Sequence, residues 1–435
     1  MERLNIHIVS LGCDKNRVDT EHMLGILAGS NAAVADDPEE ADVLIVNTCG
    51  FIEEAKRESI DVILEMAKYK ERGARALIVT GCLAQRYAHA LKDELHEVDA
   101  FLGVASYNKL LEAIRAALGG QKYMCCERLD GELDGRVLTT PAHLAYVRIA
   151  DGCSNRCSYC AIPMIRGPLK SRSLKSVLSE IEDLRAGGVQ EAILIAQDTT
   201  RYGEDLGERL LQKLITEAAD IMQGGWLRVM YAYPEGITNG LIETMVKQRN
   251  VCRYLDIPMQ HFSDNVLRHM NRRHTMASSA ALVKSLHEAG FTLRTSLIVG
   301  FPGETHDDFD TLLECVENLR FERLGVFRYS REEGTPAAQM PGQVSAQTKQ
   351  LRYDKVMALQ AGISRSLCRA QIGKIMRVLI EGRGNDGQYA GRTAGQAPDV
   401  DGVTFVDTKK DLTPGTFHDV LIKDASEYDL TGDAK

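Results

Sequence analysis

The first part of the chain alternates apolar runs of strand length with stretches that have a helical period. Three segments share the order of an apolar run, a short turn with Gly or Asn-Thr, and a helix-like stretch. They are LNIHIVSLGCDKN, ADVLIVNTCGFI and RALIVTGCLAQR. Near-continuous Val, Ile and Leu in strands that alternate with helices predict a parallel sheet covered on both faces. We therefore expect an α/β, doubly wound N-terminal domain over residues 1–125.

A second alternation of strands and helices fills the middle of the chain. Six runs follow one another, with helical patterns between them: HLAYVRI, EAILIAQ, LRVMYAY, RYLDIPM, LRTSLIVG and LGVFRYS. The pattern predicts a parallel sheet that curls towards a (β/α) barrel, and six units are too few to close an eight-stranded one. A helical stretch from Val344 to Ala370 follows, so we expect this domain to cover residues 140–370.

The pattern changes after Gly373 to short strand-like runs separated by Gly, Asp and Pro. These runs are KIMRVLIEG, QYAGRTA, GVTFVD and FHDVLIKDA. Short, evenly spaced strands of this kind predict a small antiparallel β-barrel over residues 371–435.

Composition and charge exclude some classes of protein. The net charge of −9 argues against a chain built to coat nucleic acid, which needs concentrated Lys and Arg. No segment approaches the roughly 18 uninterrupted apolar residues of a membrane span. The N-terminus runs straight into a strand pattern and lacks the features of a secretory signal, so we expect a cytoplasmic protein.

Three of the eleven cysteines lie within eight residues, in the stretch ADGCSNRCSYCAIPMIRG. We call Cys153, Cys157 and Cys160 the loop triad. Three close thiolates indicate a metal site, and three is one ligand short of a closed structural zinc site. One iron of a [4Fe–4S] cluster would then stay open for a small molecule. Two alternatives are a redox dithiol at CSYC, which leaves Cys153 without a role, and a zinc site completed by a distant ligand.

Three further cysteines each lie just past one of the N-terminal strands. We call Cys13, Cys49 and Cys82 the auxiliary triad. The carboxyl ends of parallel strands share one edge of a sheet, where ligands bind, so these cysteines are expected to converge on a second cluster site. The neighbouring Gly12 and Gly81 fit a backbone that turns tightly under a bulky group. The alternative for each cysteine is a small buried hydrophobe. That interpretation is preferred for the other five cysteines: Cys125, Cys126, Cys252, Cys315 and Cys368.

Polar and aromatic residues follow several strands of the middle domain, where catalytic groups of parallel barrels gather. They are Gln197, Asp198, Thr199, Thr200, Tyr202, Tyr233, Pro234, Gln260, His261 and the segment Gly300–Thr305. The residues of QDTT and YAYP suit a substrate or cofactor pocket, and the Gly and Pro segments also read as turns. His261 is either a metal ligand or an ordinary hydrogen-bonding histidine.

The Cx3CxxC triplet with Tyr159 before its last cysteine resembles the radical S-adenosylmethionine (SAM) superfamily. The motifs SLGCDKNRVDTE, NTCGFI and GCLAQRY, with that triplet after them, resemble its methylthiotransferase family over nearly the entire chain. The resemblance implies an open (β/α)6 barrel and a C-terminal TRAM domain. It also implies an auxiliary [4Fe–4S] cluster on Cys13, Cys49 and Cys82, and a SAM-binding [4Fe–4S] cluster on Cys153, Cys157 and Cys160. Tyr159 and Glu304 are the implied SAM contacts.

The motifs are most similar to the family members that add a methylthio group to the β-carbon of an aspartate in ribosomal protein S-twelve of the small subunit. The members that modify tRNA more often have GCQMN where this chain has GCDKN. Ser296 in RTSLIVGFPGE stands where family members often have Thr, a conservative change. Residues 370–435 hold eight Lys and Arg and eleven Asp and Glu, and a net acidic module clamps phosphate poorly. It better suits a basic protein partner, and tRNA is not the expected substrate.

The resemblance also implies the chemistry. An electron donor such as flavodoxin reduces the SAM-binding cluster, and SAM is cleaved to methionine and a 5′-deoxyadenosyl radical that removes hydrogen from a carbon. A second SAM supplies the methyl group of the methylthio product. Two alternatives stay open: a tRNA methylthiotransferase that acts on a modified adenosine, and a non-enzymatic iron–sulfur carrier. The sequence assigns no catalytic residue beyond the cluster ligands.

Overall fold

The computed structural model describes residues 3–127, 135–384 and 387–435. The chain divides into two compact units. The first unit comprises residues 1–139, 151–170 and 330–338, and the second comprises residues 140–150, 171–329 and 339–435. The segment with the loop triad therefore belongs to the same unit as the N-terminal domain. The boundaries at residues 125, 140 and 371 stay a prediction.

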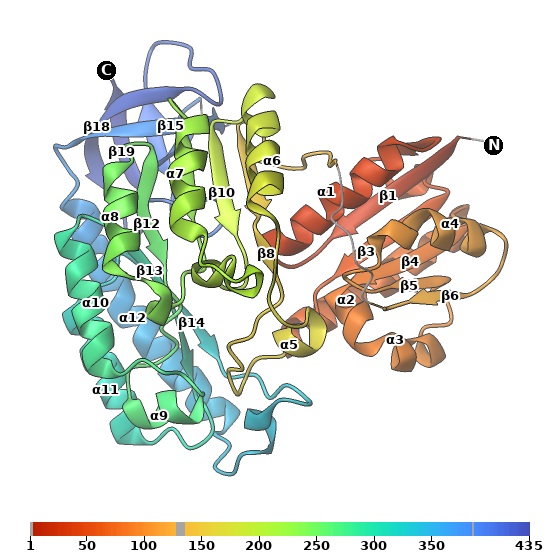
Figure 1. Cartoon of the computed structure of the whole chain (residues 1–435), viewed down its shortest axis with the longest axis horizontal. Helices are drawn as coiled ribbons and strands as arrows, with labels where there is room; N and C mark the ends of the chain where they lie inside the picture. Colours follow the sequence, from red (N-terminus) through yellow and green to blue (C-terminus); the bar gives the residue numbers. More distant parts are fainter. Residues whose placement is uncertain (1–2, 128–134, 385–386) are drawn as a thin grey trace. The chain divides into compact units, whose positions relative to one another are not determined.

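The first unit is built on a six-stranded parallel sheet of order β2-β1-β3-β4-β5-β6 (Figure 1). Its strands are β1 (Leu4–Ser10), β2 (Ala32–Val34), β3 (Val43–Thr48), β4 (Ala76–Gly81), β5 (Ala100–Leu102) and β6 (Tyr123–Cys125). Its helices are α1 (Asp14–Ala28), α2 (Glu53–Ala67), α3 (Cys82–Glu94) and α4 (Leu110–Leu118). The three predicted strands are β1, β3 and β4, and the additional strands β2, β5 and β6 have only three residues each.

Both faces of this sheet are covered, as the aliphatic strands predict. Side chains alternate along β3 and β4, so Ile45 and Ile78 enter one apolar core with residues of α1 and α4. Val46 and Val79 enter a second core with residues of α2 and α3. The doubly wound N-terminal domain is confirmed.

The second unit contains an open six-stranded parallel sheet of order β14-β13-β12-β11-β10-β7. Its strands are β7 (Leu144–Arg148), β10 (Glu191–Ile195), β11 (Trp226–Val229), β12 (Val251–Asp256), β13 (Thr292–Val299) and β14 (Arg323–Arg328). Helices α6 (Leu174–Ala186), α7 (Leu211–Ile221), α8 (Asn239–Lys247), α9 (Asp264–His269), α10 (Met276–Glu288) and α11 (His306–Leu319) connect them. Each strand matches one predicted run, so the open (β/α)6 sheet is confirmed. Helix α12 (Ala346–Arg369) is the predicted linker helix.

The C-terminal strands form a closed barrel of order β15-β16-β17-β19-β18. The strands are β15 (Ile375–Arg383), β16 (Tyr389–Thr393), β17 (Thr404–Asp407), β18 (Phe417–Ala425) and β19 (Leu430–Ala434). The barrel is antiparallel except between β17 and β19, which are parallel. The strand β19 was not predicted, and its presence explains why one pair of the predicted antiparallel barrel is parallel. With five strands, alternating directions cannot close a ring, so one neighbouring pair has to run in the same direction.

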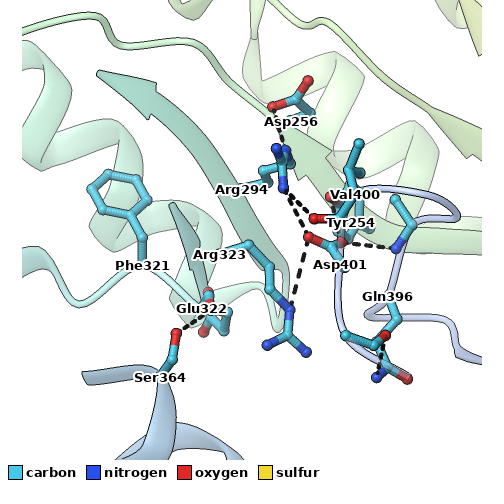
Figure 2. Close-up of polar contacts among 12 residues, drawn as sticks. Tyr254, Asp256, Arg294, Phe321, Glu322, Arg323, Ser364, Gln396, Val400 and Asp401 are labelled. Carbon is cyan, nitrogen blue, oxygen red and sulfur yellow. Dashed lines mark hydrogen bonds and ion pairs between the residues drawn. The ribbon is translucent and has the colours of Figure 1, made fainter. Parts of the chain in front are cut away.

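Within the second unit, the segment after β16 contacts the amino-terminal ends of the open sheet's strands. Figure 2 shows Asp401 between Tyr254 of β12 and Arg294 of β13. The Asp401 carboxylate accepts a hydrogen bond from the Tyr254 hydroxyl at 2.8 Å and pairs with Arg294 Nη1 at 3.0 Å. Burial and the charge of Asp401 raise the pKa of Tyr254 well above its ordinary value, so its hydroxyl stays protonated and donates.

A second buried contact joins the same two parts. Glu191 at the start of β10 accepts from Arg228 Nε and from Arg392 Nη2 of the small barrel, each at 2.7 Å. The side chains of Glu191 and Arg228 are fully buried and that of Arg392 is 2% exposed. Burial alone raises the pKa of Glu191, but the two guanidinium groups lower it, so the carboxylate is charged. The small barrel is thus fixed to the open sheet by a buried carboxylate that both arginines share.

Among the residues that the structure describes, no helix is long and apolar enough to cross a membrane.

Candidate functional site

The auxiliary triad lies at the carboxyl edge of the N-terminal sheet. Cys13 is the residue before α1, Cys49 follows β3, and Cys82 is the first residue of α3. Burial raises the pKa of Cys49, and burial raises that of Cys82 to about 12. The charge of Cys13 adds to both shifts, and that of Cys49 adds to the shift of Cys82. The three thiols therefore lie close enough to act on one another electrostatically, as the convergence of strand ends predicts.

Glycines make the turns that bring these cysteines together. Gly12 and Gly81 have φ angles of +90° and +94°, a region that L side chains avoid. A Cβ on Gly12 would meet Cys49 Cβ at 3.0 Å, and one on Gly81 would meet Thr48 O at 2.4 Å. Gly50 leaves no room either, because its Cβ would meet Leu83 Cα at 2.8 Å. The predicted tight turns at Gly12 and Gly81 are confirmed.

The loop triad lies on a segment that packs into the same unit. The Cys153 N–H donates to Gly167 O at 2.9 Å, which brings the two ends of the loop together. Ala161, which precedes the short helix α5 (Ile162–Ile165), and Ile165, its last residue, are fully buried in the apolar core that also contains Cys82. The loop is therefore anchored on the N-terminal domain by its carboxyl-terminal half.

Residues 330–338 also contact both cysteine-bearing regions of the first unit. Glu332, which is 2% exposed, pairs with Arg86 at 2.7 Å and with Lys56 at 3.2 Å. Arg86 also donates to the carbonyl of Gly50, the residue after Cys49, at 3.2 Å. The Ala337 N–H donates to the carbonyl of Ser158 in the loop triad's segment at 2.9 Å.

The donor set has the chemistry of iron–sulfur cluster ligands. In the described ranges, no group of three His, Cys, Asp or Glu side chains has the spacing to hold one metal ion. A [4Fe–4S] cluster distributes its cysteine ligands over several irons, so the ligands stand further apart than those of one ion. Cysteine thiolates are the ligands that such clusters take, and the chain offers two sets of three, one of them on glycine turns that leave no room for a Cβ. All eleven cysteines are free thiols.

Helix α1 buries polar residues that sequence reasoning did not single out. Asn16 and Asp19 are fully buried, and Lys15, Thr20, Glu21 and His22 of the same helix are each below 9% exposed. Asn16 donates to Leu11 O and Thr48 O, both at 2.9 Å, and so holds the turns before Cys13 and Cys49. Asp19 pairs with Arg166 at 2.7 Å. The segment DKNRVDTE could have indicated this, because polar side chains that a helix buries need hydrogen-bond partners.

The strand-end residues of the second unit are mostly engaged in ordering their own loops. Asp198 Oδ1 accepts from Thr200 N–H at 3.0 Å and from Thr200 Oγ1 at 2.6 Å. His261 Nδ1 accepts from Ser263 N–H at 2.9 Å, which agrees with an ordinary hydrogen-bonding histidine. Tyr231 and Gln260 have positive φ angles of 60° and 69°, and strained backbone at strand ends is typical of functional sites.

The two residues predicted to contact SAM differ in exposure. The carboxylate of Glu304 is buried, accepts from the Phe301 N–H at 2.8 Å and pairs with Arg352 at 2.9 Å. Tyr159 is half-buried in the loop triad's segment. Both SAM contacts stay predictions.

The cysteines outside the triads lie in ordinary structural positions. Cys252 of β12 is buried, and burial raises the pKa of its thiol to about 12. Cys315 of α11 and Cys126 are half-buried, and burial raises each of their pKa values to about 11. Thiols held in the protonated form are unreactive.

Models of three protein families match successive parts of the chain. They are Uncharacterized protein family UPF0004 at residues 5–103, the Radical SAM superfamily at residues 147–316 and the TRAM domain at residues 372–434. Among solved structures, the radical SAM methyltransferase TsrM from Kitasatospora setae, with cobalamin and a [4Fe–4S] cluster bound, has a TM-score of 0.56 at 15% identity. That alignment covers 78% of this chain and 74% of that chain, and it indicates a shared fold.

Curated relatives match from end to end. The ribosomal protein uS12 methylthiotransferase RimO of Pelotomaculum thermopropionicum is 48% identical over 439 residues, which covers 99% of both chains. RimO of Geobacter sulfurreducens is 48% identical and covers 98% of both. Such identity over whole chains, together with the two cysteine triads and the three-part fold, places the protein: it belongs to the RimO family of ribosomal protein uS12 methylthiotransferases, within the radical SAM superfamily.

Proposed function

We propose that this protein transfers a methylthio group to the β-carbon of an aspartate in ribosomal protein uS12. The pair of cysteine triads within one compact unit carries the proposal. A radical SAM enzyme that only generates radicals needs one triad, and a second triad on strand ends gives the sulfur a place to be held. The whole-chain similarity to RimO proteins supports uS12 as the substrate.

The cofactors are two [4Fe–4S] clusters and SAM. We assign Cys13, Cys49 and Cys82 to the auxiliary cluster, and Cys153, Cys157 and Cys160 to the cluster that binds SAM. When bound, these groups supply the radical that removes a hydrogen atom, the sulfur, and the methyl group from a second SAM. Tyr159 and Glu304 are the proposed SAM contacts.

The protein's own residues orient these groups. Asn16 fixes the turns that carry Cys13 and Cys49 through its two backbone hydrogen bonds. The core around Ala161 and Ile165 keeps water away from the base of the loop triad's segment, since both side chains are fully buried. Arg86 and Glu332 hold residues 330–338 next to Gly50.

The charge of the small barrel supports a basic protein partner over tRNA. Of its cationic residues, Arg392 is buried against Glu191 and so is removed from the surface. Exposed acidic and basic side chains are mixed on its surface: Asp399, Asp407, Asp411, Asp419, Asp424 and Asp433 alternate with Lys374, Arg377, Arg383, Lys409, Lys410, Lys423 and Lys435. Over residues 370–435 the eleven Asp and Glu exceed the eight Lys and Arg, and this net negative charge suits a positively charged ribosomal protein better than phosphate.

Mass spectrometry of the reaction product tests the proposal. The reconstituted protein, given SAM, a reductant and a peptide with the uS12 target loop, is expected to replace one hydrogen of the aspartate by a methylthio group. The matched control peptide carries Asn at that position and should stay unmodified. Modification of tRNA without modification of the peptide would support the tRNA methylthiotransferase instead.

The electron donor and the location follow from this function. A flavodoxin-like protein is the proposed reductant, and the cytoplasm is the proposed location because newly made ribosomal proteins are there. Anaerobic turnover with flavodoxin and its reductase as the only electron source tests the first point. A lack of turnover there, with turnover from dithionite, would contradict it.

A further inference from the structure

Arg166 connects the two ends of the loop that carries the loop triad. Its side chain is 1% exposed, and it is the last residue but one of the motif CAIPMIRG. Its Nη1 lies 3.2 and 3.3 Å from the two carboxylate oxygens of Asp151, which begins the same loop. One edge of the guanidinium thus joins the beginning and the end of the loop that carries the three loop cysteines.

The second terminal nitrogen of the same guanidinium, Nη2, contacts residues next to the auxiliary triad. Arg166 Nη2 donates to Asp19 Oδ2 at 2.7 Å and to Asn16 Oδ1 at 2.8 Å, both on α1 directly after Cys13. The same nitrogen lies 3.7 Å from the Sγ of Cys82. One buried side chain therefore contacts the stem of the loop triad and a member of the auxiliary triad.

The charge and shape of this contact are specific to arginine. Burial alone lowers the pKa of Arg166, but Asp19, Asp151 and Cys82 raise it well above its ordinary value, so the guanidinium stays charged. Its planar fork donates to partners on two sides at once, whereas a lysine ammonium is a point charge that reaches only one. Hydrogen bonds to the sulfurs of an iron–sulfur cluster are among the factors that set its reduction potential.

We propose that Arg166 is a positioning residue that fixes the loop triad against the auxiliary triad and raises the reduction potential of the auxiliary cluster through its contact with Cys82. The proposal rests on the proposed function for the identity of the two clusters. A guanidinium beside a thiolate favours the more negative, reduced state of the cluster. Fixing the loop keeps the radical source and the sulfur at one separation, so that hydrogen removal is followed by sulfur transfer.

A redox titration of the auxiliary cluster alone provides a measurement that a purely structural anchor would not change. In a background with all three loop cysteines replaced by Ala, Arg166→Lys is expected to lower the potential followed by electron paramagnetic resonance. Arg172→Lys is the matched control, because Arg172 also donates to a carboxylate and a carbonyl, those of Glu180 and Arg148, away from both triads. Its potential should equal that of the parent.

A second measurement, in the protein with all six cysteines, tests the positioning. Arg166→Lys is expected to form about tenfold more 5′-deoxyadenosine per methylthio product, since small misplacements of reacting groups cost large factors in rate. The same ratio should be unchanged in Arg172→Lys. A ratio equal to the parent's would contradict the positioning role.

A charge-neutral pair keeps the proposal testable if the single change impairs folding, because Asp19 is fully buried and Arg166→Lys shortens its partner. The double variant Asp19→Asn, Arg166→Gln replaces the ion pair by a neutral hydrogen bond, and its auxiliary potential is expected to lie below that of Asp19→Asn alone, because only the guanidinium charge differs between these two variants. Equal potentials in these two folded, cluster-loaded variants overturn the inference. Because this titration needs no substrate, failure of methylthio transfer to uS12 would overturn the proposed function and leave the inference standing.

Discussion

Two buried arginine clusters, one in each unit, satisfy their charges in different ways. In the second unit, both oxygens of Glu191 accept from guanidinium groups, Arg228 and Arg392, and the nearby thiol of Cys252 belongs to neither triad. In the first unit, Arg166 is paired with Asp19 and Asp151 and also lies against the thiol of Cys82. The arginine cluster in the second unit therefore joins structural groups alone, whereas the one in the first unit contacts a thiol that is proposed to hold an iron–sulfur cluster.

The difference separates stability from function. A buried carboxylate between two guanidinium groups is costly to disrupt and performs no chemistry, so it acts as a fixed joint between the open sheet and the small barrel. A guanidinium beside a thiol influences what that thiol binds. The predictions below test this contrast.

Removal of the thiols themselves should have the largest effect. Replacing the loop triad by Ala is expected to abolish SAM cleavage, because its cluster has no other described ligands. Replacing the auxiliary triad should leave SAM cleavage and abolish methylthio transfer. Chromatography of 5′-deoxyadenosine and of the modified peptide measures both. Cys315→Ala is the control and should retain both activities; loss of cleavage in the auxiliary variant would contradict the division of labour.

Glu191→Ala should be the most destabilising change in the second unit. It leaves Arg228 and Arg392 buried without their shared carboxylate, at a cost of about 3–5 kcal/mol in the free energy of unfolding. Urea unfolding followed by fluorescence of the only tryptophan, Trp226, measures it, since that ring packs edge-on against Phe417 of the small barrel at 4.8 Å. The exposed Glu182→Ala should change stability by less than about 0.5 kcal/mol. Equal losses of unfolding free energy in the two variants would show that the Glu191 ion pairs do not stabilise the second unit.

Asp401→Asn should have a smaller effect at the neighbouring contact in Figure 2. The amide keeps an acceptor for Tyr254 and loses the charge that pairs with Arg294, so about 1–3 kcal/mol is expected. The same fluorescence measurement applies. Tyr254→Phe in the Asp401→Asn background should add little, because the shared hydrogen bond is already weakened. A large additional loss would mean that the two groups act independently.

Glu235→Gln should have the smallest effect and a distinct pH dependence. Burial raises the pKa of Glu235, but its hydrogen bond with His274 lowers it to about 2, against an ordinary value of 4.5. The carboxylate's stabilisation is therefore complete above about pH 4.5 and is lost as pH falls through about 2. The variant should be about 1 kcal/mol less stable at pH 7 and converge on the parent in acid. A constant difference across that range would contradict the assignment.

The secondary structure was predictable because its signals are local. Aliphatic runs such as ADVLIVNTC specify buried parallel strands, and the cysteines that follow them specify an edge of the sheet. The short strands β2, β5 and β6 have three residues each and carry no such signal. The parallel pair of β17 and β19 follows from closing a ring of five strands, which no single segment specifies.

The sequence by itself determined the two cysteine triads, the order of the domains and the glycine turns beside Cys13 and Cys82. Each of these depends on residue type and on neighbours along the chain. Only the tertiary structure decided that Arg166 lies against Asp19 and Cys82, residues 147 and 84 positions away. The physical reason is that a buried charge is stable only where distant segments bring compensating groups to it, and a linear pattern does not record which segments meet.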